Sequence, residues 1–452
     1  MNKMTRLLTI ALVSASLLEP ALAEQPAAHA VADWIKSAVI YEVNPRTFSP
    51  SGDFRGIEER LDYLKALGVT VVWIMPIHPV GQAKKKGGIG SPYAVQDYYA
   101  INSSYGTKED FKRLVSEAHQ RGLKVIIDIV ANHTAWDSVL MKHPEFYKKD
   151  AQGNIIPPNP DWSDVAGLDY RNPQLRSYMT EMLKYWLKEF DLDGFRCDVA
   201  GEVPTEFWEN ARVELTKIKP DLIMIAEANK PELLTKAFDL DYAWPFHSTM
   251  TDVLENGVSA QAIVFDWDTE HARYPKGALE MRFSDNHDEK RAIARFGERG
   301  TLAASTLVFT MDGVPMLYNG MEVGDTTESG APALFEKLPV FWPIAERRSS
   351  FLPFYKELIA IRKAHPALEQ GETEWVRNGA PERVLTFFRR GGGEEYFVAI
   401  NVSNQPYAGV VDAPNGEYVD ETPGRQESAR RNTMPPTLVL NGWDFRIYRK
   451  MR

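Results

Sequence analysis

Short apolar runs alternate with amphipathic helical stretches from Trp34 to Leu368. The runs at 71–75, 125–130 and 222–226 are nearly continuous, which is typical of parallel strands buried on both faces. A repeated strand–helix unit builds either an open doubly wound sheet or a closed (β/α)8 barrel. Because no glycine-rich phosphate-binding fingerprint follows the first strand, the pattern counts against the doubly wound sheet.

The helical stretches carry recognisable start and stop signals. Thr107 is a candidate N-cap for a helix whose apolar stripe spans 111–118. The apolar residues of 57–64 predict an earlier helix that Gly68 closes, and those of 175–190 predict a later one.

Two segments break this rhythm. The proline-rich segment 154–162 follows the third strong strand and indicates a small insertion. Beyond Pro366 the helical pattern stops, and a separate antiparallel β domain is expected from strand-like runs at 384–388, 396–402 and 437–448, with a glycine turn at 391–393.

Charge and cysteine content exclude several classes of protein. The chain has 62 acidic and 52 basic residues and a net charge of −10, so it lacks the basic excess that binds nucleic acid or an anionic membrane surface. Its one cysteine, Cys197, excludes an intramolecular disulfide and a cysteine-rich metal site. The oligomeric state has no signature in the sequence.

The first 23 residues have the organisation of an export signal. Lys3 and Arg6 precede an apolar stretch at 7–18, and Ala21-Leu22-Ala23 offers a small-x-small cleavage site. The stretch is short for a membrane span, which needs about 20 residues. We therefore expect a periplasmic or secreted mature chain that is not inserted in a membrane.

Polar clusters stand where four of the predicted strands end, at 128–133, 194–198, 226–227 and 283–288. In a (β/α)8 barrel, functional side chains gather at the C-terminal ends of the strands. Each cluster alone is explained by a loop cap or an ion pair, but their combination indicates an active site.

Two of these carboxyl groups have environments suited to opposite roles. Arg196 and Asp198 are two residues apart on a strand and project to the same side, while Cys197 points away into packing. A guanidinium beside a carboxylate keeps it ionised, as a nucleophile requires. Glu227 ends an apolar strand, where desolvation raises the pKa and favours a proton-donating acid. Such a pair suits glycoside cleavage.

The ordered segments DIVANH, GFRCD, AE and NHD resemble the four main sequence regions of the α-amylase family, glycoside hydrolase family 13. Segments 56–76 and 313–322 resemble the strand-two and strand-eight regions of the family. The resemblance implies a (β/α)8 TIM barrel, a short B domain inserted after the third strand, and a C-terminal antiparallel β-sandwich domain. The expected domains are an export signal at 1–23, the barrel at 24–133 and 171–368, the B domain at 134–170, and the β domain at 369–452.

The resemblance also implies a catalytic set. Asp198 corresponds to the nucleophile and Glu227 to the general acid/base, and Asp288 corresponds to a third carboxylate that binds hydroxyls of the distorted sugar. Arg196 supports the nucleophile.

Substrate-binding roles follow in the same way. His133 and His287 correspond to residues that hydrogen-bond the sugar on the non-reducing side of the cleaved bond, and Tyr93 to the aromatic platform beneath that sugar. Without the resemblance, both histidines would be interpreted as core or capping residues and Tyr93 as ordinary packing. The run Lys84-Lys85-Lys86 before Gly87-Gly88 predicts a solvated loop near the site.

Departures from the family pattern leave the metal and the precise substrate open. Asn132 aligns with a calcium-ligating position of many amylases, but no Lys-His pair follows the nucleophile, where this chain has 199–202 as VAGE. The segment 165–169 matches neither the oligo-1,6-glucosidase nor the neopullulanase signature, and the B domain is short. We expect no required cofactor, calcium included, and the sequence assigns no metal ligands.

Together with the export signal, the resemblance favours an exported retaining hydrolase of α-1,4-glucosidic bonds in starch or maltooligosaccharides. A cyclomaltodextrinase, an α-glucosidase or a glucan transglycosylase would use the same residues, because water and sugar attack the same intermediate. Outside enzymes, the alternative is a non-catalytic glucan-binding protein.

The export signal yields the first prediction. Cleavage after Ala23 gives a mature protein that begins at Glu24, because the small-x-small pattern ends there. N-terminal sequencing of the exported product checks this expectation. Recovery of intact Met1 in a membrane fraction would contradict it.

Overall fold

The computed structural model describes residues 26–414, 416–425, 431–434 and 437–451. The predicted export signal at 1–23 lies outside the described residues. Within those ranges, no helix combines the length and apolarity needed to cross a membrane.

Eight parallel strands close into a barrel, which confirms the predicted fold class. Their order around the barrel is β1-β10-β9-β8-β7-β6-β3-β2. The barrel strands are β1 (Ile40–Val43), β2 (Val71–Ile74), β3 (Lys124–Val130), β6 (Gly194–Asp198), β7 (Ile223–Ala226), β8 (Leu240–Tyr242), β9 (Leu279–Arg282) and β10 (Val314–Tyr318).

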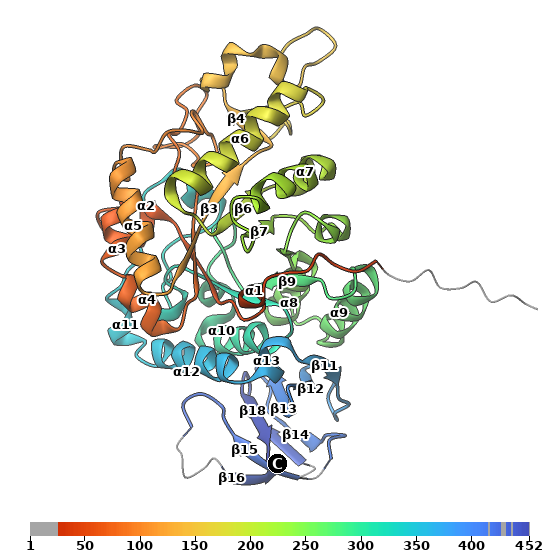
Figure 1. The fold of residues 1–452 in the computed structure, drawn as a ribbon. Helices are drawn as coiled ribbons and strands as arrows, with labels where there is room; N and C mark the ends of the chain where they lie inside the picture. The colour runs from red at the N-terminus through yellow and green to blue at the C-terminus, as the bar shows by residue number, and fades with distance from the viewer. Residues whose placement is uncertain (1–25, 415, 426–430, 435–436, 452) are drawn as a thin grey trace, which may run out of the picture.

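Helices surround the barrel, and most of them lie in the connections between its strands (Figure 1). They are α1 (Asp33–Lys36), α2 (Pro45–Phe48), α3 (Phe54–Glu58), α4 (Leu61–Leu67), α5 (Lys108–Gln120), α6 (Pro173–Phe190), α7 (Thr205–Thr216), α8 (Trp244–Asn256), α9 (Gln261–Arg273), α10 (Ala292–Thr310), α11 (Ile344–Arg347), α12 (Phe351–Ala364) and α13 (Pro366–Gln370).

Alternation along each strand separates two apolar cores. Ile40, Trp73 and Ile225 belong to the cluster inside the barrel, whereas Phe195 and Cys197 pack in the larger cluster with the helices. The buried Cys197 thus points away from the barrel interior, as predicted. Sequence pattern and packing agree because successive side chains of a strand project to opposite faces.

The capping signals are confirmed, but one predicted helix is divided. Thr107 and Asp110 form a reciprocal capping box at the start of α5. The helix expected over 57–64 is instead α3 followed by α4, because the backbone of Arg60 leaves the helical region (φ −111°, ψ 7°). The Arg60 guanidinium lies 3.8 Å from the Trp342 ring centroid, a tertiary contact that the local pattern does not encode.

The insertion after β3 contains a small antiparallel pair, β4 (His133–Ala135) with β5 (Val165–Gly167). Short 3₁₀ turns at Val139–Lys142 and Pro144–Phe146 follow β4. In Figure 1 the insertion stands at the top of the molecule, and the C-terminal domain lies at the bottom. The insertion therefore borders the end of the barrel at which β3 terminates.

The C-terminal domain is built from antiparallel sheets that pack on a shared core, as predicted. One sheet has six strands in the order β11-β12-β13-β18-β15-β16, and β14 pairs with β17 in a second sheet. These strands are β11 (Glu372–Trp375), β12 (Val384–Gly391), β13 (Glu394–Asn401), β14 (Tyr407–Val410), β15 (Gly416–Asp420), β16 (Arg431–Met434), β17 (Thr437–Leu440) and β18 (Phe445–Lys450). The run at 437–448, expected as one strand-like stretch, is two strands in different sheets, because the chain turns after Leu440.

A buried arginine joins the C-terminal domain to the barrel. Arg389 on β12 donates hydrogen bonds to the carbonyls of Thr310, at the end of α10, and Gly371 at 2.6 and 2.7 Å. Burial lowers the pKa of Arg389 to about 10. The domain boundaries at 133/134, 170/171 and 368/369 stay predictions.

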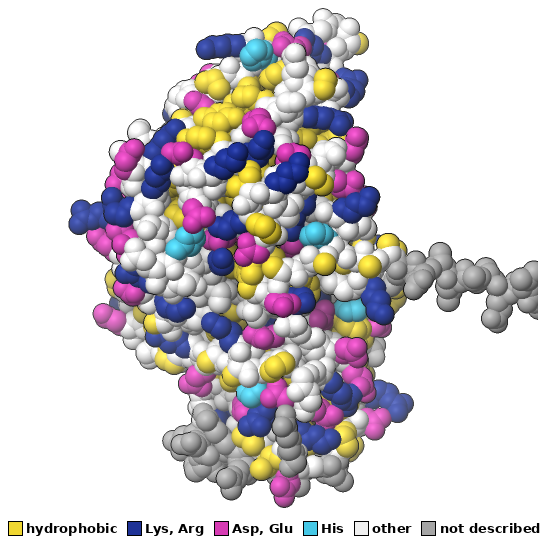
Figure 2. Space-filling view, in the orientation of Figure 1, with side chains coloured by type: hydrophobic (Ala, Val, Ile, Leu, Met, Phe, Trp, Pro, Cys, Tyr) yellow, Lys and Arg dark blue, Asp and Glu magenta, His cyan; other side chains and the backbone are white. Residues whose placement is uncertain are grey.

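Basic and acidic side chains are interspersed over the face shown in Figure 2. This distribution accords with the small excess of acidic residues in the sequence. That the protein does not bind nucleic acid stays a prediction.

Candidate active site

The buried guanidinium of Arg196 organises the C-terminal end of the barrel. Its Nη1 lies 2.9 Å from Asp128 Oδ1 and 3.0 Å from Asp198 Oδ1. Its Nη2 lies 2.9 Å from Glu227 Oε2, an ion pair whose geometry does not form a hydrogen bond. Asp128 and Arg196 are register partners on β3 and β6, which explains why they meet. The structure thus brings together the two carboxyl groups that the sequence paired, Asp198 and Glu227.

Burial dominates the electrostatics of this pair. Removal from water raises the pKa of Glu227 to about 7, against the opposing effect of Arg196 and with added repulsion from Asp198. Burial raises the pKa of Asp198 to about 6, again opposed by Arg196. Glu227 therefore retains its proton to higher pH than Asp198, the order needed for an acid and a nucleophile. The predicted effect of Arg196, which favours the ionised form of Asp198, is present, but desolvation acts more strongly and raises the pKa.

A second hydrogen-bonded group surrounds His287. Its Nε2 lies 2.7 Å from the Tyr93 hydroxyl and 3.2 Å from Asp288 Oδ2, and its Nδ1 contacts Glu42. Burial opposes a charged imidazole, but the carboxylates of Asp288 and Glu42 raise the pKa of His287 to about 9. A protonated His287 donates to the Tyr93 hydroxyl, which in turn donates to Asp128 Oδ2 at 3.0 Å. The group is therefore connected to the Arg196 cluster.

His133 lies at the start of β4, where the insertion leaves the barrel. Burial lowers its pKa to about 4, so the imidazole is neutral at ordinary pH. Its ring meets the Trp162 ring edge to face, with centroids 5.7 Å apart. A neutral imidazole at the cavity wall is suited to hydrogen bonding with an uncharged ligand.

A cavity of about 390 Å³ opens above these groups. Six of the predicted site residues line it, and Arg196 lies buried beneath Asp198 and Glu227. The lining residues singled out by the sequence are Tyr93, His133, Asp198, Glu227, His287 and Asp288.

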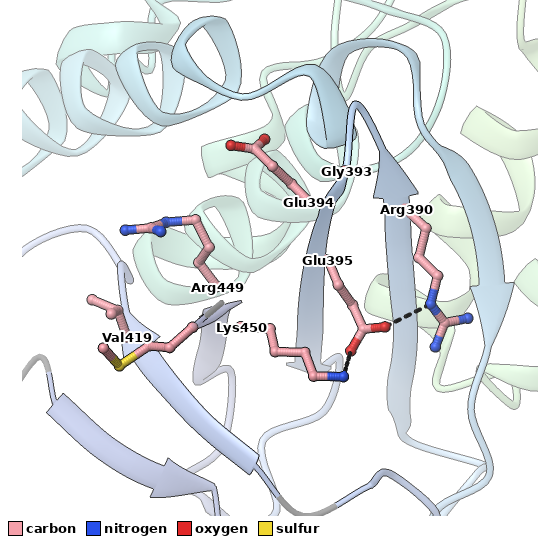
Figure 3. Close-up of a pocket in the computed structure, with 8 residues that line it drawn as sticks. Arg390, Gly393, Glu394, Glu395, Val419, Arg449 and Lys450 are labelled. Carbon is pink, nitrogen blue, oxygen red and sulfur yellow. Dashed lines mark hydrogen bonds and ion pairs between the residues drawn. The ribbon is translucent and has the colours of Figure 1, made fainter.

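A larger hollow of about 650 Å³ lies in the C-terminal domain (Figure 3). Glu395 in this hollow is paired with Arg390 at 2.8 Å and with Lys450 at 3.1 Å. These partners hold the pKa of Glu395 below its usual value although partial burial opposes them. A carboxylate that stays ionised and is paired with two cations has no proton to donate as a catalytic acid. The cavity at the barrel end is therefore the better candidate for the active site.

Sequence reasoning missed several residues of the site. Glu42 is fully buried on β1, in the run Ile-Tyr-Glu-Val, and contacts His287. A carboxylate inside an otherwise apolar strand was the available signal, because such a group is rarely buried without a partner. The cavity is also lined by Lys86, Trp162 and Asp164. These residues lie on loops that are far apart in the sequence, so no local pattern predicts that they come together.

The family model "Alpha amylase, catalytic domain" matches residues 30–154 and 159–338. The chain belongs to the α-amylase family. This agrees with the resemblance read from the four sequence regions, and with the closed barrel and the C-terminal sheets.

Individual relatives of this family are similar over most of the chain. The intracellular maltogenic amylase of Bacillus subtilis (strain 168) is 30% identical over 389 residues, which cover 76% of this chain but 64% of that relative. A cyclomaltodextrinase of Geobacillus thermopakistaniensis is 26% identical, covering 91% of this chain and 77% of the relative. Among solved structures, a maltogenic alpha-amylase of Thermotoga neapolitana is 32% identical with a TM-score of 0.84, covering 92% of this chain and 99% of that one.

That calcium is not required stays a prediction from the sequence. A calcium ion takes about 6–8 oxygen ligands. The amide nitrogen of Asn132 lies 3.5 Å from His133 Nδ1. Within the described ranges, no group of three or more His, Cys, Asp or Glu side chains is placed to hold a metal ion.

The order of the two pKa values predicts a bell-shaped pH profile. Activity rises through about pH 6 as Asp198 loses its proton, and falls above about pH 7 as Glu227 loses the proton it must donate. Measuring kcat/KM on a maltooligosaccharide against pH checks both limbs. Glu227→Gln should lose the alkaline limb, and an alkaline limb that persists in this variant would contradict the assignment.

The sequence predicts that removing calcium has little effect. Prolonged EDTA treatment should leave both the melting temperature and the activity nearly unchanged, because the short insertion and the absent Lys-His pair remove expected calcium ligands. Scanning calorimetry before and after chelation makes the measurement. A large fall in melting temperature that added calcium reverses would show the expectation to be wrong.

Proposed function

We propose that this chain is an exported retaining glycoside hydrolase that cleaves α-1,4-glucosidic bonds of starch or maltooligosaccharides. One observation carries the proposal: a single guanidinium contacts both Asp198 and Glu227. Carboxyl groups that share one planar cation lie close together, which favours the spacing of about 5–5.5 Å of retaining enzymes over the wider spacing of inverting ones.

The reaction proceeds in two displacements. The Asp198 carboxylate attacks the anomeric carbon while the glycosidic C–O bond breaks, and Glu227 gives its proton to the departing oxygen. Glu227, now ionised, takes a proton from water as the water oxygen attacks the same carbon. The bond to Asp198 breaks, and the sugar leaves with its original anomeric configuration.

The second hydrogen-bonded group supports the sugar. Asp288 accepts hydrogen bonds from hydroxyls of the reacting ring, and the protonated His287, whose Nε2 lies 3.2 Å from Asp288 Oδ2, stabilises that carboxylate. Tyr93 presents its ring from the cavity wall, supported by a stacked His287 at a centroid distance of 5.3 Å. Aromatic faces and charged hydrogen-bonding groups are suited to a polar sugar with apolar C–H faces.

Export and cofactor independence belong to the same proposal. The basic start, the apolar stretch and the Ala21-Leu22-Ala23 site support export of this chain. The Bacillus subtilis relative is named as intracellular, so location differs within the family if the proposal holds. No metal is required for the two displacements described above.

Related activities use the same groups and are separated by their products. A cyclomaltodextrinase, the activity named for the Geobacillus relative, would prefer cyclodextrin over starch. A transglycosylase would give longer oligosaccharides, and an α-glucosidase would give glucose alone. Product analysis on soluble starch, maltotriose, cyclodextrin and pullulan distinguishes them, whereas a glucan-binding protein would give no product.

Two variants test the mechanism. Asp198→Ala should abolish activity, since no glycosyl-enzyme can form. Glu227→Gln should slow starch hydrolysis by roughly 10²–10⁴-fold but spare an aryl maltoside, whose leaving group needs little protonation. Assays on both substrates, with the anomeric configuration of the first product followed by NMR, provide the measurement.

The matched control is Asp62→Ala, which removes an exposed carboxylate bonded to Arg121 on the outer helices and should leave activity unchanged. An initial product of inverted configuration, or full starch activity in Asp198→Ala, would overturn the mechanism.

A further inference from the structure

Lys84 and Lys85 are exposed on the predicted loop near the site, whereas Lys86 contacts the insertion. Its ammonium lies 3.2 Å from Asp164 Oδ1 and donates a hydrogen bond to the Asp161 carbonyl at 2.7 Å. The Asp164 side chain is 9% exposed, and both Lys86 and Asp164 line the active-site cavity. We call this contact the Lys86–Asp164 bridge.

The residues after Lys86 are held by the loop that follows β10. The Ile89 amide donates to the Phe335 carbonyl at 3.1 Å, and the Gly88 amide donates to Glu336 Oε1 at 3.0 Å. Gly87 has a φ of +64°, and a Cβ there would lie 2.3 Å from Phe335 Cβ, so this close approach requires glycine.

Arg46 links segment 86–90 to the loop that follows β10. Its Nη1 donates to the carbonyls of Gly90 at 2.7 Å and Leu334 at 2.8 Å. Segment 86–90 therefore spans the cavity rim from the insertion to the loop containing Leu334 and Phe335, both of which line the cavity.

The contacts of Glu227 show which of its oxygens can protonate the leaving group. Oε2 accepts a hydrogen bond from the Val199 amide at 2.7 Å and lies 2.9 Å from Arg196 Nη2, so Oε1 carries the proton for the departing oxygen. The group around Asp288 and Tyr93 holds the ring that keeps the reacting carbon.

The rim lies on the side of that ring. Tyr93 follows segment 86–90 directly in the chain, and its amide bonds Ser91 Oγ at 3.1 Å. A Cβ on Gly330 would lie 3.0 Å from the Asp288 carbonyl, so the loop after β10 also passes beside Asp288. The segments that meet at the bridge thus stand beyond the non-reducing side of the reacting sugar.

We propose that the Lys86–Asp164 bridge closes the non-reducing side of the cavity and binds the terminal glucose of the glucan chain, so that the enzyme cleaves short pieces from chain ends. The inference rests on the proposed function and names its substrate class: maltooligosaccharides with a free non-reducing end. An ammonium has three N–H donors, of which Asp161 and Asp164 take two, so the third can donate to a sugar hydroxyl. The Asp164 carboxylate accepts from a neighbouring hydroxyl.

The cavity size supports a short occupant. Its volume of about 390 Å³ is near the lower end of the range of roughly 300–1,000 Å³ that ligand pockets span. A chain that continued past the bridge would have to displace the ion pair and the glycine contact with Phe335. A free chain end needs neither change.

The test compares two chromogenic substrates that differ at one end. One is a nitrophenyl maltopentaoside with a free non-reducing glucose, and the other carries an ethylidene group on that glucose. The wild-type enzyme should cleave the free substrate and should cleave the blocked one far more slowly. Substrate loss and product length, measured by chromatography, give kcat and KM for each.

Lys86→Met keeps the length of the side chain and removes its charge. In this variant KM for the free substrate should rise by roughly tenfold or more, the loss expected for a hydrogen bond to a charged group, with kcat changed less. The kcat/KM for the blocked substrate should rise relative to that for the free substrate, because the ion pair no longer holds the loop to the insertion. Lys108→Met is the matched control. Its ammonium bonds the Tyr185 hydroxyl on the outer helices and does not line the cavity, so this variant should leave both kinetic constants unchanged.

Asp164→Asn is the second variant and breaks the same ion pair from the insertion. Like Lys86→Met, it should lower the ratio of kcat/KM for the free substrate to kcat/KM for the blocked one. Melting temperatures show that each variant is folded. Equal cleavage of both substrates by the wild type would overturn the inference, as would an unchanged ratio in the two folded variants. If the free substrate is not cleaved at all, the proposed function fails instead.

Discussion

A positive charge buried inside the barrel is the interaction on which the site depends. The Arg196 side chain is 0% exposed, and such a charge is tolerated only when it is paired and hydrogen-bonded. Asp128, Asp198 and Glu227 approach it from three strand ends. The same contacts that satisfy the guanidinium hold the proposed nucleophile and acid in place, so stability and chemistry have one origin.

The pairing also explains why two similar carboxyl groups behave differently. Asp198 forms a hydrogen bond with the guanidinium, whereas Glu227 lies near it without one and accepts from the Val199 amide. Neutral carboxylic acids are favoured where a charged partner is poorly aligned and water is excluded. A difference in hydrogen-bond geometry at one cation therefore accompanies the division of labour.

The sequence predicted what depends on local order and strand alternation. The barrel, the insertion, the Thr107 capping box and the inward direction of Arg196 and Asp198 all follow from short-range patterns. Catalytic and binding roles remain predictions for Asp198, Glu227, Asp288 and the substrate-binding residues. The structure shows where these side chains lie but not which chemical step each performs.

Long-range contacts set the limit of such prediction. Arg60, where the helix breaks, lies over the ring of Trp342; His287 contacts Glu42; and Lys86 pairs with Asp164. In each case the partner lies far along the chain, and its identity follows from the completed fold. The sequence can indicate that such a residue has a partner, as with a charge in an apolar strand or a lysine run beside glycines. It does not predict which residue the partner is.

The arginine that crosses from the C-terminal domain has a consequence for modularity. Arg389 covers the last carbonyl of α10, and β10, which completes the barrel, begins shortly after that helix. One face of its sheet contributes Leu385 and Phe387 to the core that the barrel helices share. Removing the domain would therefore uncover an apolar surface and leave a buried helix end without its donor. The barrel and its β domain share one apolar core, and recombination at their boundary would have to preserve that contact surface.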